Sequence, residues 1–259
     1  GTVFFWLYAL FLSLRTWRCK NVHYDLAFIL DTSSSVGKDN FEKIRKWVAD
    51  LVDSFDVSPD KTRVAVVLYS DRPTIEFNLS RHKTLEDVKR AARNIRFLGG
   101  NTMTGDAISY TTRNIFTERN GARPQAKGVQ KVAILLTDGR SQDYVLEPSQ
   151  EAAKAGIRMF AVGIGEALKE ELEEIAAAPK NAHVFHVTDF NAIDKIRGRL
   201  RRRLCESKSV CLPKCSCTCN SYFQKQTNEQ QSVFSKYADL QMLMFCIVLY
   251  LYVFINDHI

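Results

Sequence analysis

The segment FILDTSSSVG, residues 28–37, ends an apolar run with the carboxylate of Asp31 and continues with hydroxyl side chains and a glycine. Ser and Asp at such a position can cap a turn or a helix. A cluster this rich in oxygen atoms can also bind a metal ion. Two later segments add side chains of the same type: GGNTMTGDA contains Thr102, and TDGRSQD contains Asp138.

The residues that could bind such an ion are Asp31, Ser33, Ser35, Thr102 and Asp138. They supply carboxylate and hydroxyl oxygens, and none of them is Cys or His. Hard oxygen donors suit Mg²⁺, Mn²⁺ or Ca²⁺ and do not suit Zn²⁺ or Cu²⁺. The set predicts a divalent cation site, with Mg²⁺ as the favoured ion. The alternative is a group of loop caps around a site that binds nothing.

The elements that would position these residues alternate between strand-like and helix-like segments. Apolar runs rich in Val, Ile and Phe predict buried strands at residues 24–30, 63–70, 131–137, 157–164 and 183–187. Amphipathic stretches predict helices at residues 40–55, 84–95, 104–116, 147–156 and 168–178. Residues 73–79 alternate and begin with Pro, as in an antiparallel edge strand.

This pattern predicts an α/β fold over residues 22–204: a doubly wound, mostly parallel sheet with helices on both faces. Ligands of such sheets bind beyond the carboxyl ends of the strands, where the winding reverses. The three oxygen-rich segments follow predicted strands or precede a predicted helix. We therefore expect them to meet at that edge.

The oxygen-rich segments resemble the metal-ion-dependent adhesion site of von Willebrand factor type A domains. The D-x-S-x-S pattern is met at Asp31, Ser33 and Ser35, the later threonine at Thr102, and the T-D-G aspartate at Asp138. The resemblance implies a Rossmann-like fold in which the serines, and often the threonine, bind the metal directly. It also implies that the aspartates act mainly through water, and that an acidic side chain of a partner completes the coordination.

The resemblance covers about residues 22–204. The segments TLEDVKRAARNIRFLGGNTMTGDAI, VAILLTDGRSQD and DFNAIDKIRGRLRRRLC are most similar to the amino-terminal A domain of fibril-associated collagens, type XXII in particular. The implied function is a secreted extracellular-matrix adhesion module that binds a matrix or cell-surface protein. The alternatives are a membrane-anchored adhesion receptor and a structural A domain with an unused site.

The short segment after Asp138 leaves little room for the extra helix of collagen-binding integrin A domains, which argues against recognition of triple-helical collagen. Catalysis is also not expected. Asp31 resembles the nucleophile of haloacid-type phosphatases, but Ser33 replaces the aspartate that would serve as the general acid. The sequence contains no G-x-S-x-G elbow. We expect a binding module and not an enzyme.

The beginning of the chain and its cysteines indicate export. Residues 1–18 resemble the apolar part of a signal peptide whose front is missing, with a buried strand as the alternative. Export would place the 7 cysteines in an oxidising compartment. Cys19 and Cys205 bracket the predicted domain, so a disulfide between them would join its ends. Two unrelated free thiols are the alternative.

Beyond the predicted domain the composition changes. Residues 205–239 are rich in Cys and lack an apolar period, and residues 240–255 form an apolar stretch of marginal spanning length. We weigh a membrane segment or cleaved anchor, a cysteine-rich stalk, and a translated non-coding extension. The extension is favoured, because collagens of this kind would continue into Gly-X-Y repeats.

The net charge of +7 has a local origin in one run of arginines. The run consists of Arg197, Arg199, Arg201, Arg202 and Arg203. A local patch argues against a general affinity for nucleic acid. The first interpretation is a solvated helix end, where cations complement the helix dipole. Contact with sulfated glycosaminoglycans is the alternative.

Overall fold

The computed structural model describes residues 23–124 and 128–205. Its sheet has 6 strands in the order β3-β2-β1-β4-β5-β6. The strands are β1 (Tyr24–Asp31), β2 (Arg63–Tyr69), β3 (Thr74–Phe77), β4 (Gln130–Thr137), β5 (Ile157–Ile164) and β6 (Val184–Val187). All neighbours pair in parallel except β2 and β3, which pair antiparallel at one edge. The predicted α/β fold with one antiparallel edge strand is confirmed.

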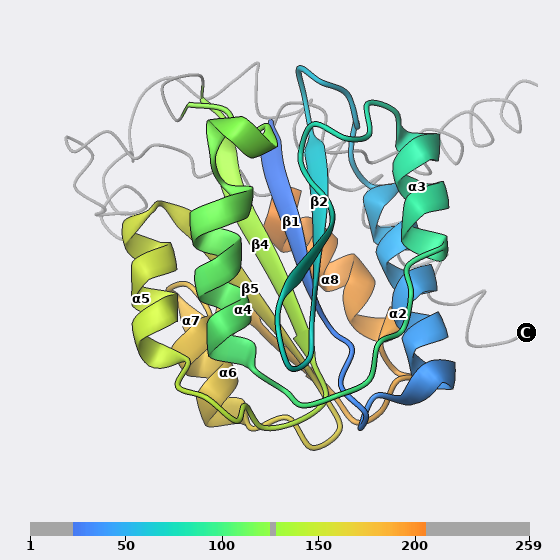
Figure 1. The fold of residues 1–259 in the computed structure, drawn as a ribbon, viewed down its shortest axis with the longest axis vertical. Helices are drawn as coiled ribbons and strands as arrows, with labels where there is room; N and C mark the ends of the chain where they lie inside the picture. The colour runs from blue at the N-terminus through green and yellow to red at the C-terminus, as the bar shows by residue number, and fades with distance from the viewer. Residues whose placement is uncertain (1–22, 125–127, 206–259) are drawn as a thin grey trace, which may run out of the picture. The chain divides into compact units, whose positions relative to one another are not determined.

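Helices cover both faces of this sheet (Figure 1). They are α2 (Gly37–Val52), α3 (Leu85–Arg93), α4 (Thr104–Tyr110), α5 (Leu146–Lys154), α6 (Lys169–Ile175), α7 (Lys180–His183) and α8 (Asp194–Cys205). A π-helical turn, Thr111–Ile115, follows α4, and a 3-10 turn follows at Glu118–Asn120.

Two elements differ from the sequence prediction. The helix expected over residues 104–116 becomes π-helical after Tyr110, where the Thr111 hydroxyl donates to the Ala107 carbonyl at 2.8 Å. Such bonds from side chain to carbonyl compete with the regular helix ladder. His183, expected to begin a strand, instead ends α7, and its ring nitrogen Nδ1 lies 3.0 Å from the Pro179 carbonyl oxygen.

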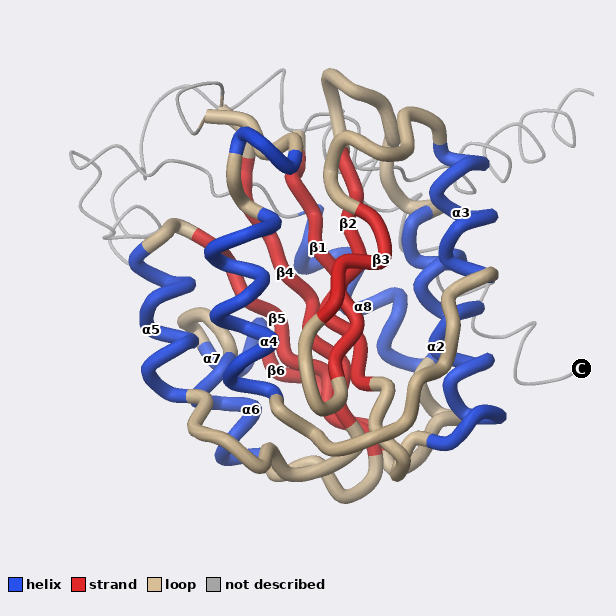
Figure 2. The backbone as a smooth tube through the Cα atoms, viewed as in Figure 1, coloured by secondary structure: helices blue, strands red, loops and turns tan. Residues whose placement is uncertain are grey.

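The strands form one layer between two layers of helices (Figure 2). Every residue of β1 is buried, because its side chains alternate between two cores. Leu26 and Phe28 pack in the core that contains α2, α3 and α8. Ala27 and Ile29 pack in the core that contains α4, α5 and α6. The apolar runs are therefore unbroken because both faces of the sheet are covered.

The winding of the sheet reverses between β1 and β4. β1 pairs with β2 on one side and with β4 on the other, both in parallel. The carboxyl ends of β1 and β4 are thus neighbours, and they point toward the bottom of Figure 1. Asp31 ends β1, and Asp138 directly follows β4. The fold therefore places these two carboxylates at the switch point of the sheet.

Candidate metal centre

Asp31 is a fully buried carboxylate that accepts hydrogen bonds from neutral groups. Its Oδ1 accepts from the backbone N–H of Ser33 at 2.8 Å, and its Oδ2 accepts from the Thr137 hydroxyl at 2.9 Å. Burial raises the pKa of Asp31 to about 6, and the nearby charge of Asp138 adds to this increase. Within the described part of the chain, Asp31 forms no ion pair with a cationic side chain.

A chain of oxygen atoms connects Ser33 with Asp138. The Ser33 and Ser35 hydroxyl oxygens lie 3.0 Å apart, and the Ser35 hydroxyl donates to Asp138 Oδ1 at 2.9 Å. Ser33 is buried, whereas Ser35 is exposed and Asp138 is half-buried. Burial also raises the pKa of Asp138. The structure thus brings four of the predicted residues into one cluster that reaches from the core to the solvent.

Thr102, the fifth predicted residue, lies in the loop between α3 and α4 and is largely buried. Backbone hydrogen bonds hold this loop against the other two. Ser34 N–H donates to the Gly100 carbonyl at 2.9 Å, and Gln142 N–H donates to the Thr102 carbonyl at 2.9 Å. Among the described residues, no hydrogen bond joins the Thr102 hydroxyl to the other four predicted residues.

The approach of this loop depends on Gly99 and Gly100. Both have positive φ, 80° and 112°, which other residues rarely adopt. A Cβ on Gly100 would lie 2.9 Å from Asp71 Oδ2, which is too close for real contacts. Asp71 Oδ1 in turn accepts from the Asn101 N–H at 3.0 Å. The two glycines of the GGNTMTGDA segment therefore position Thr102 as well as allowing the turn.

Sequence reasoning missed three residues that shape the site. Thr137 binds Asp31 directly, and the Ser34 hydroxyl accepts from the Gly100 N–H at 3.0 Å. Tyr69 is buried at the end of β2, where its hydroxyl accepts from Thr104 at 3.3 Å. Burial and then the Asp31 charge raise the Tyr69 pKa well above its usual value. The signal for Thr137 was its place directly before Asp138.

These residues fit a small divalent cation. A buried carboxylate without a cationic partner is costly, and buried charges in proteins are normally paired or bound to metal. The hydroxyls beside Asp31 are oxygen donors that Mg²⁺ and similar ions accept. Within the described ranges no group of three or more His, Cys, Asp or Glu side chains could hold a metal, and the oxygen atoms gathered at this site include the hydroxyls of Ser33 and Ser35.

The arginine run lies on α8, as predicted, but its members differ in their contacts. Arg197 forms ion pairs with Asp50 at 2.9 Å and with Asp194 at 3.2 Å. The Arg199 guanidinium lies over the Phe185 ring, 5.9 Å from its centroid. Contact of the run with glycosaminoglycans stays a prediction.

Several predictions involve residues outside the described ranges. Cys205 is disulfide-bonded, but Cys19 is not among the described residues, so their pairing stays a prediction. The signal-like segment 1–18, the Cys-rich segment from residue 206 to 239 and the apolar segment 240–255 also lie outside. Within residues 23–124 and 128–205, no helix has the length and apolar character needed to cross a bilayer.

Comparison with known proteins identifies the family. The family model of the von Willebrand factor type A domain matches residues 25–199. The chain belongs to this family. It is 39% identical to human matrilin-1 over 221 residues, which cover 84% of this chain and 44% of matrilin-1. It is 43% identical to the Xenopus laevis collagen α-1(XXI) chain over 194 residues, 74% of this chain and 20% of that protein. The chain thus spans less than half the length of these relatives.

Solved structures from the mussel byssus show the same fold. Proximal thread matrix protein 1 matches with a TM-score of 0.67 and 28% identity, covering 71% of this chain and 48% of that chain. A second structure of that protein has a zinc-occupied adhesion-site motif and matches with a TM-score of 0.65 and 30% identity. The family and this relative imply a divalent cation site. Zinc is accepted in that relative, although donor hardness had favoured Mg²⁺.

Matrilins and collagen XXI are secreted structural proteins of the extracellular matrix. They confirm the predicted resemblance to A domains of collagen-like matrix proteins and the predicted secreted, extracellular localisation. The narrower assignment to collagen type XXII stays a prediction, as do the domain boundaries. None of these relatives is named as an enzyme.

Proposed function

We propose that this chain is a matrix adhesion module in which a divalent cation joins the domain to an acidic side chain of a protein partner. The observation that carries the proposal is the environment of Asp31. Asp31 is a fully buried carboxylate with neutral hydrogen-bond partners, and it lies beside hydroxyl donors at the switch point of the sheet. A cation at this point would supply the missing positive charge.

The five residues would have two roles, direct binding of the cation and support of the residues that bind it. Ser33, Ser35 and Thr102 would hold the cation directly, with Mg²⁺ as the first choice. Asp31 and Asp138 would attract the cation by charge and orient the serines through the hydrogen bonds described above. A bound cation supplies a coordination position for an oxygen anion, because neutral hydroxyls leave its charge incompletely neutralised. Ser35 is exposed, so a partner carboxylate could approach from solvent.

The surface around the site supports a protein as the partner. Leu98, on the α3–α4 loop, is 51% exposed, and Tyr144, on the β4–α5 loop, is 91% exposed. Large apolar side chains on binding loops are the kind that a protein partner covers. Residues 138–145 contain no helix, which supports the prediction that triple-helical collagen is not the ligand. A matrix or cell-surface protein with an exposed Asp or Glu fits this surface best.

Metal binding is tested first, by calorimetric titration of the full chain with Mg²⁺, Mn²⁺, Ca²⁺ and Zn²⁺. We expect one ion per chain, and an affinity at least about tenfold lower in Ser35→Ala, a loss of 1.4 kcal/mol or more. Ser80→Ala is the matched control, because Ser80 is also an exposed serine but hydrogen-bonds to Asn78 in another loop. Equal affinities in the two variants would exclude the predicted site.

Partner binding is tested on surfaces coated with the full chain. Wild-type protein should capture matrix proteins or cells in Mg²⁺ or Mn²⁺ and release them in EDTA. Asp138→Ala should capture none, because it removes the charge and the hydrogen bond to Ser35. Metal binding without any metal-dependent capture across a broad panel would favour a structural A domain with an unused site.

A further inference from the structure

A second polar site lies at the edge of the sheet opposite β3. β6 is the edge strand there, and α7 precedes it directly. A groove of 380 Å³ runs between this edge and α8. Arg199, Arg202 and Arg203 line it from α8, and Asn181 and His186 line it from α7 and β6. Its volume lies within the range of ordinary ligand sites, about 300–1,000 Å³.

Helical spacing explains why these arginines converge. Arg199 is three residues before Arg202 and four before Arg203, so the side chains share one face of α8. Leu200 and Leu204 are buried against the sheet, which leaves the arginine face at the surface. The Arg199 guanidinium also lies over the Phe185 ring, 5.9 Å from its centroid. Such cation–π contact restricts the long side chain before any ligand binds.

The charged side chains described in the groove wall have one sign. Among the described residues that line it none is Asp or Glu, and three are arginines. Arg197 and Arg201 do not line the groove, and Arg197 forms ion pairs with Asp50 and Asp194. The arginine run therefore has two parts: Arg197, which joins α8 to Asp50 of α2, and the three arginines that line the groove.

We propose that this groove binds sulfate groups of a glycosaminoglycan. Guanidinium groups present paired N–H donors that match the oxygens of such anions. A groove takes a chain of spaced anions better than a single small ion, because several charges are engaged at once. The relatives place this chain in the extracellular matrix, where sulfated polysaccharides are the accessible polyanions. The site is separate from the metal centre, and its occupant needs no cation.

The test compares two charge-matched double variants of the full chain on immobilised heparin. Arg199→Gln with Arg202→Gln removes two charges from the groove. Arg81→Gln with Arg119→Gln removes two exposed charges that do not line it. We expect the groove variant to bind heparin at least about tenfold more weakly, with the slope of log affinity against log salt reduced by about two. The control variant should lose much less affinity.

Three further measurements make the result specific. Thermal unfolding should show that both variants fold like wild type, and Arg202→Gln alone gives a milder replacement if the double variant does not. EDTA should leave heparin binding unchanged, which separates this site from the metal centre. Desulfated heparin should bind much more weakly than heparin, which identifies the sulfate as the recognised group. Equal loss in both double variants, or no loss in either, would overturn the proposal and leave α8 with a solvated basic end.

Discussion

Asp25 and Asp31 lie on the same strand, β1, and both side chains are fully buried. Their partners differ. Arg123 binds Asp25 with its backbone N–H, which donates to Oδ2 at 2.6 Å, and with its Nε, which donates to Oδ1 at 2.9 Å. Asp31 accepts from the Ser33 N–H and from the Thr137 hydroxyl, both of them neutral donors. Asp25 is therefore paired with a cationic side chain, whereas Asp31 forms no ion pair among the residues that the structure describes.

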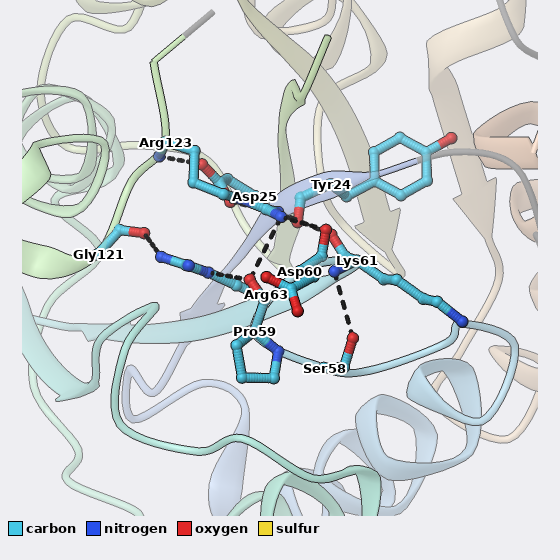
Figure 3. A network of polar contacts seen from close by, with 9 residues as sticks. All are labelled: Tyr24, Asp25, Ser58, Pro59, Asp60, Lys61, Arg63, Gly121 and Arg123. Atoms are coloured by element: carbon cyan, nitrogen blue, oxygen red, sulfur yellow. Dashed lines mark hydrogen bonds and ion pairs between the residues drawn. The ribbon is translucent and has the colours of Figure 1, made fainter. Parts of the chain in front are cut away.

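Arg123 also fixes the loops around Asp25 (Figure 3). Its guanidinium donates to the Asp60 carbonyl at 2.9 Å and to the carbonyls of Tyr24 and Lys61, each at 2.7 Å. This network neutralises the buried charge of Asp25 and gives it hydrogen-bond donors, so the pair has a structural role. Burial of a carboxylate is therefore not by itself a sign of function. What distinguishes Asp31, at the end of β1 that we propose as a metal site, is that no cationic side chain in residues 23–124 and 128–205 pairs with it.

Arg123→Met tests the Asp25–Arg123 pair at the start of β1, and it should have the largest effect on the free energy of unfolding. It would leave the Asp25 charge buried without its partner, which typically costs about 3–5 kcal/mol of unfolding free energy. Urea denaturation measures the loss. Arg113→Met is the control, because Arg113 also forms two hydrogen bonds to a carboxylate, that of Glu151, but through its side chain alone and in solvent, where the pair adds little. Similar losses in the two variants would contradict the comparison.

Asp31→Asn tests the end of β1 at the proposed metal site, and it should increase the stability of the metal-free domain instead of lowering it. In EDTA at pH 7.5 the wild type must keep the Asp31 carboxylate ionised although its pKa is raised from 3.8 to about 6. A difference of about 2 pKa units corresponds to at most about 3 kcal/mol, so the neutral amide should stabilise the metal-free domain by about 1–3 kcal/mol. Asp25→Asn should instead destabilise it. A loss of stability in Asp31→Asn, measured by urea denaturation, would mean that Asp31 has a cationic partner.

The increase in stability caused by Asp31→Asn should also depend on pH. Between pH 3.8 and about 6 the folded wild type binds more protons at Asp31 than the unfolded chain does. The penalty for the buried charge is therefore complete above about pH 6 and disappears as the pH falls toward 3.8. Urea denaturation in EDTA at pH 7.5, 6 and 5 should show the two proteins converging in stability. A constant difference would exclude Asp31 as the titrating group.

Ser35→Ala should have the smallest effect on the metal-free domain. Ser35 is exposed, and its bond to Asp138 lies at the surface. We expect a change within about 0.5 kcal/mol in EDTA, as for most surface substitutions. In thermal unfolding, Mg²⁺ should raise the melting temperature of the wild type and should not raise that of the variant. A large loss in EDTA would mean that the serine supports the fold and not the ion.

The sequence predicted the structure best where a single local pattern determines an element or a site. The apolar runs of β1, β4 and β5 predicted buried strands, and the oxygen-rich segments after β1 and β4 predicted the cluster at Asp31. Thr137 was not assigned to that cluster, because a threonine at the end of a strand is also an ordinary strand residue. The Asp25–Arg123 pair could not be predicted, since 98 residues separate its members and Arg123 lies in no regular element.

The backbone hydrogen bonds between the three site loops have a thermodynamic consequence. Ser34 N–H, Gly99 N–H and Gln142 N–H donate across loops, with donor–acceptor distances of 2.9, 2.8 and 2.9 Å. The entropy of ordering these loops is therefore lost when the protein folds and not when a ligand binds. Amide hydrogen exchange at these three residues should already be slow in EDTA. The domain would then bind with a rigid surface, and its affinity would be set by the contacts of the partner and not by reorganisation of the loops.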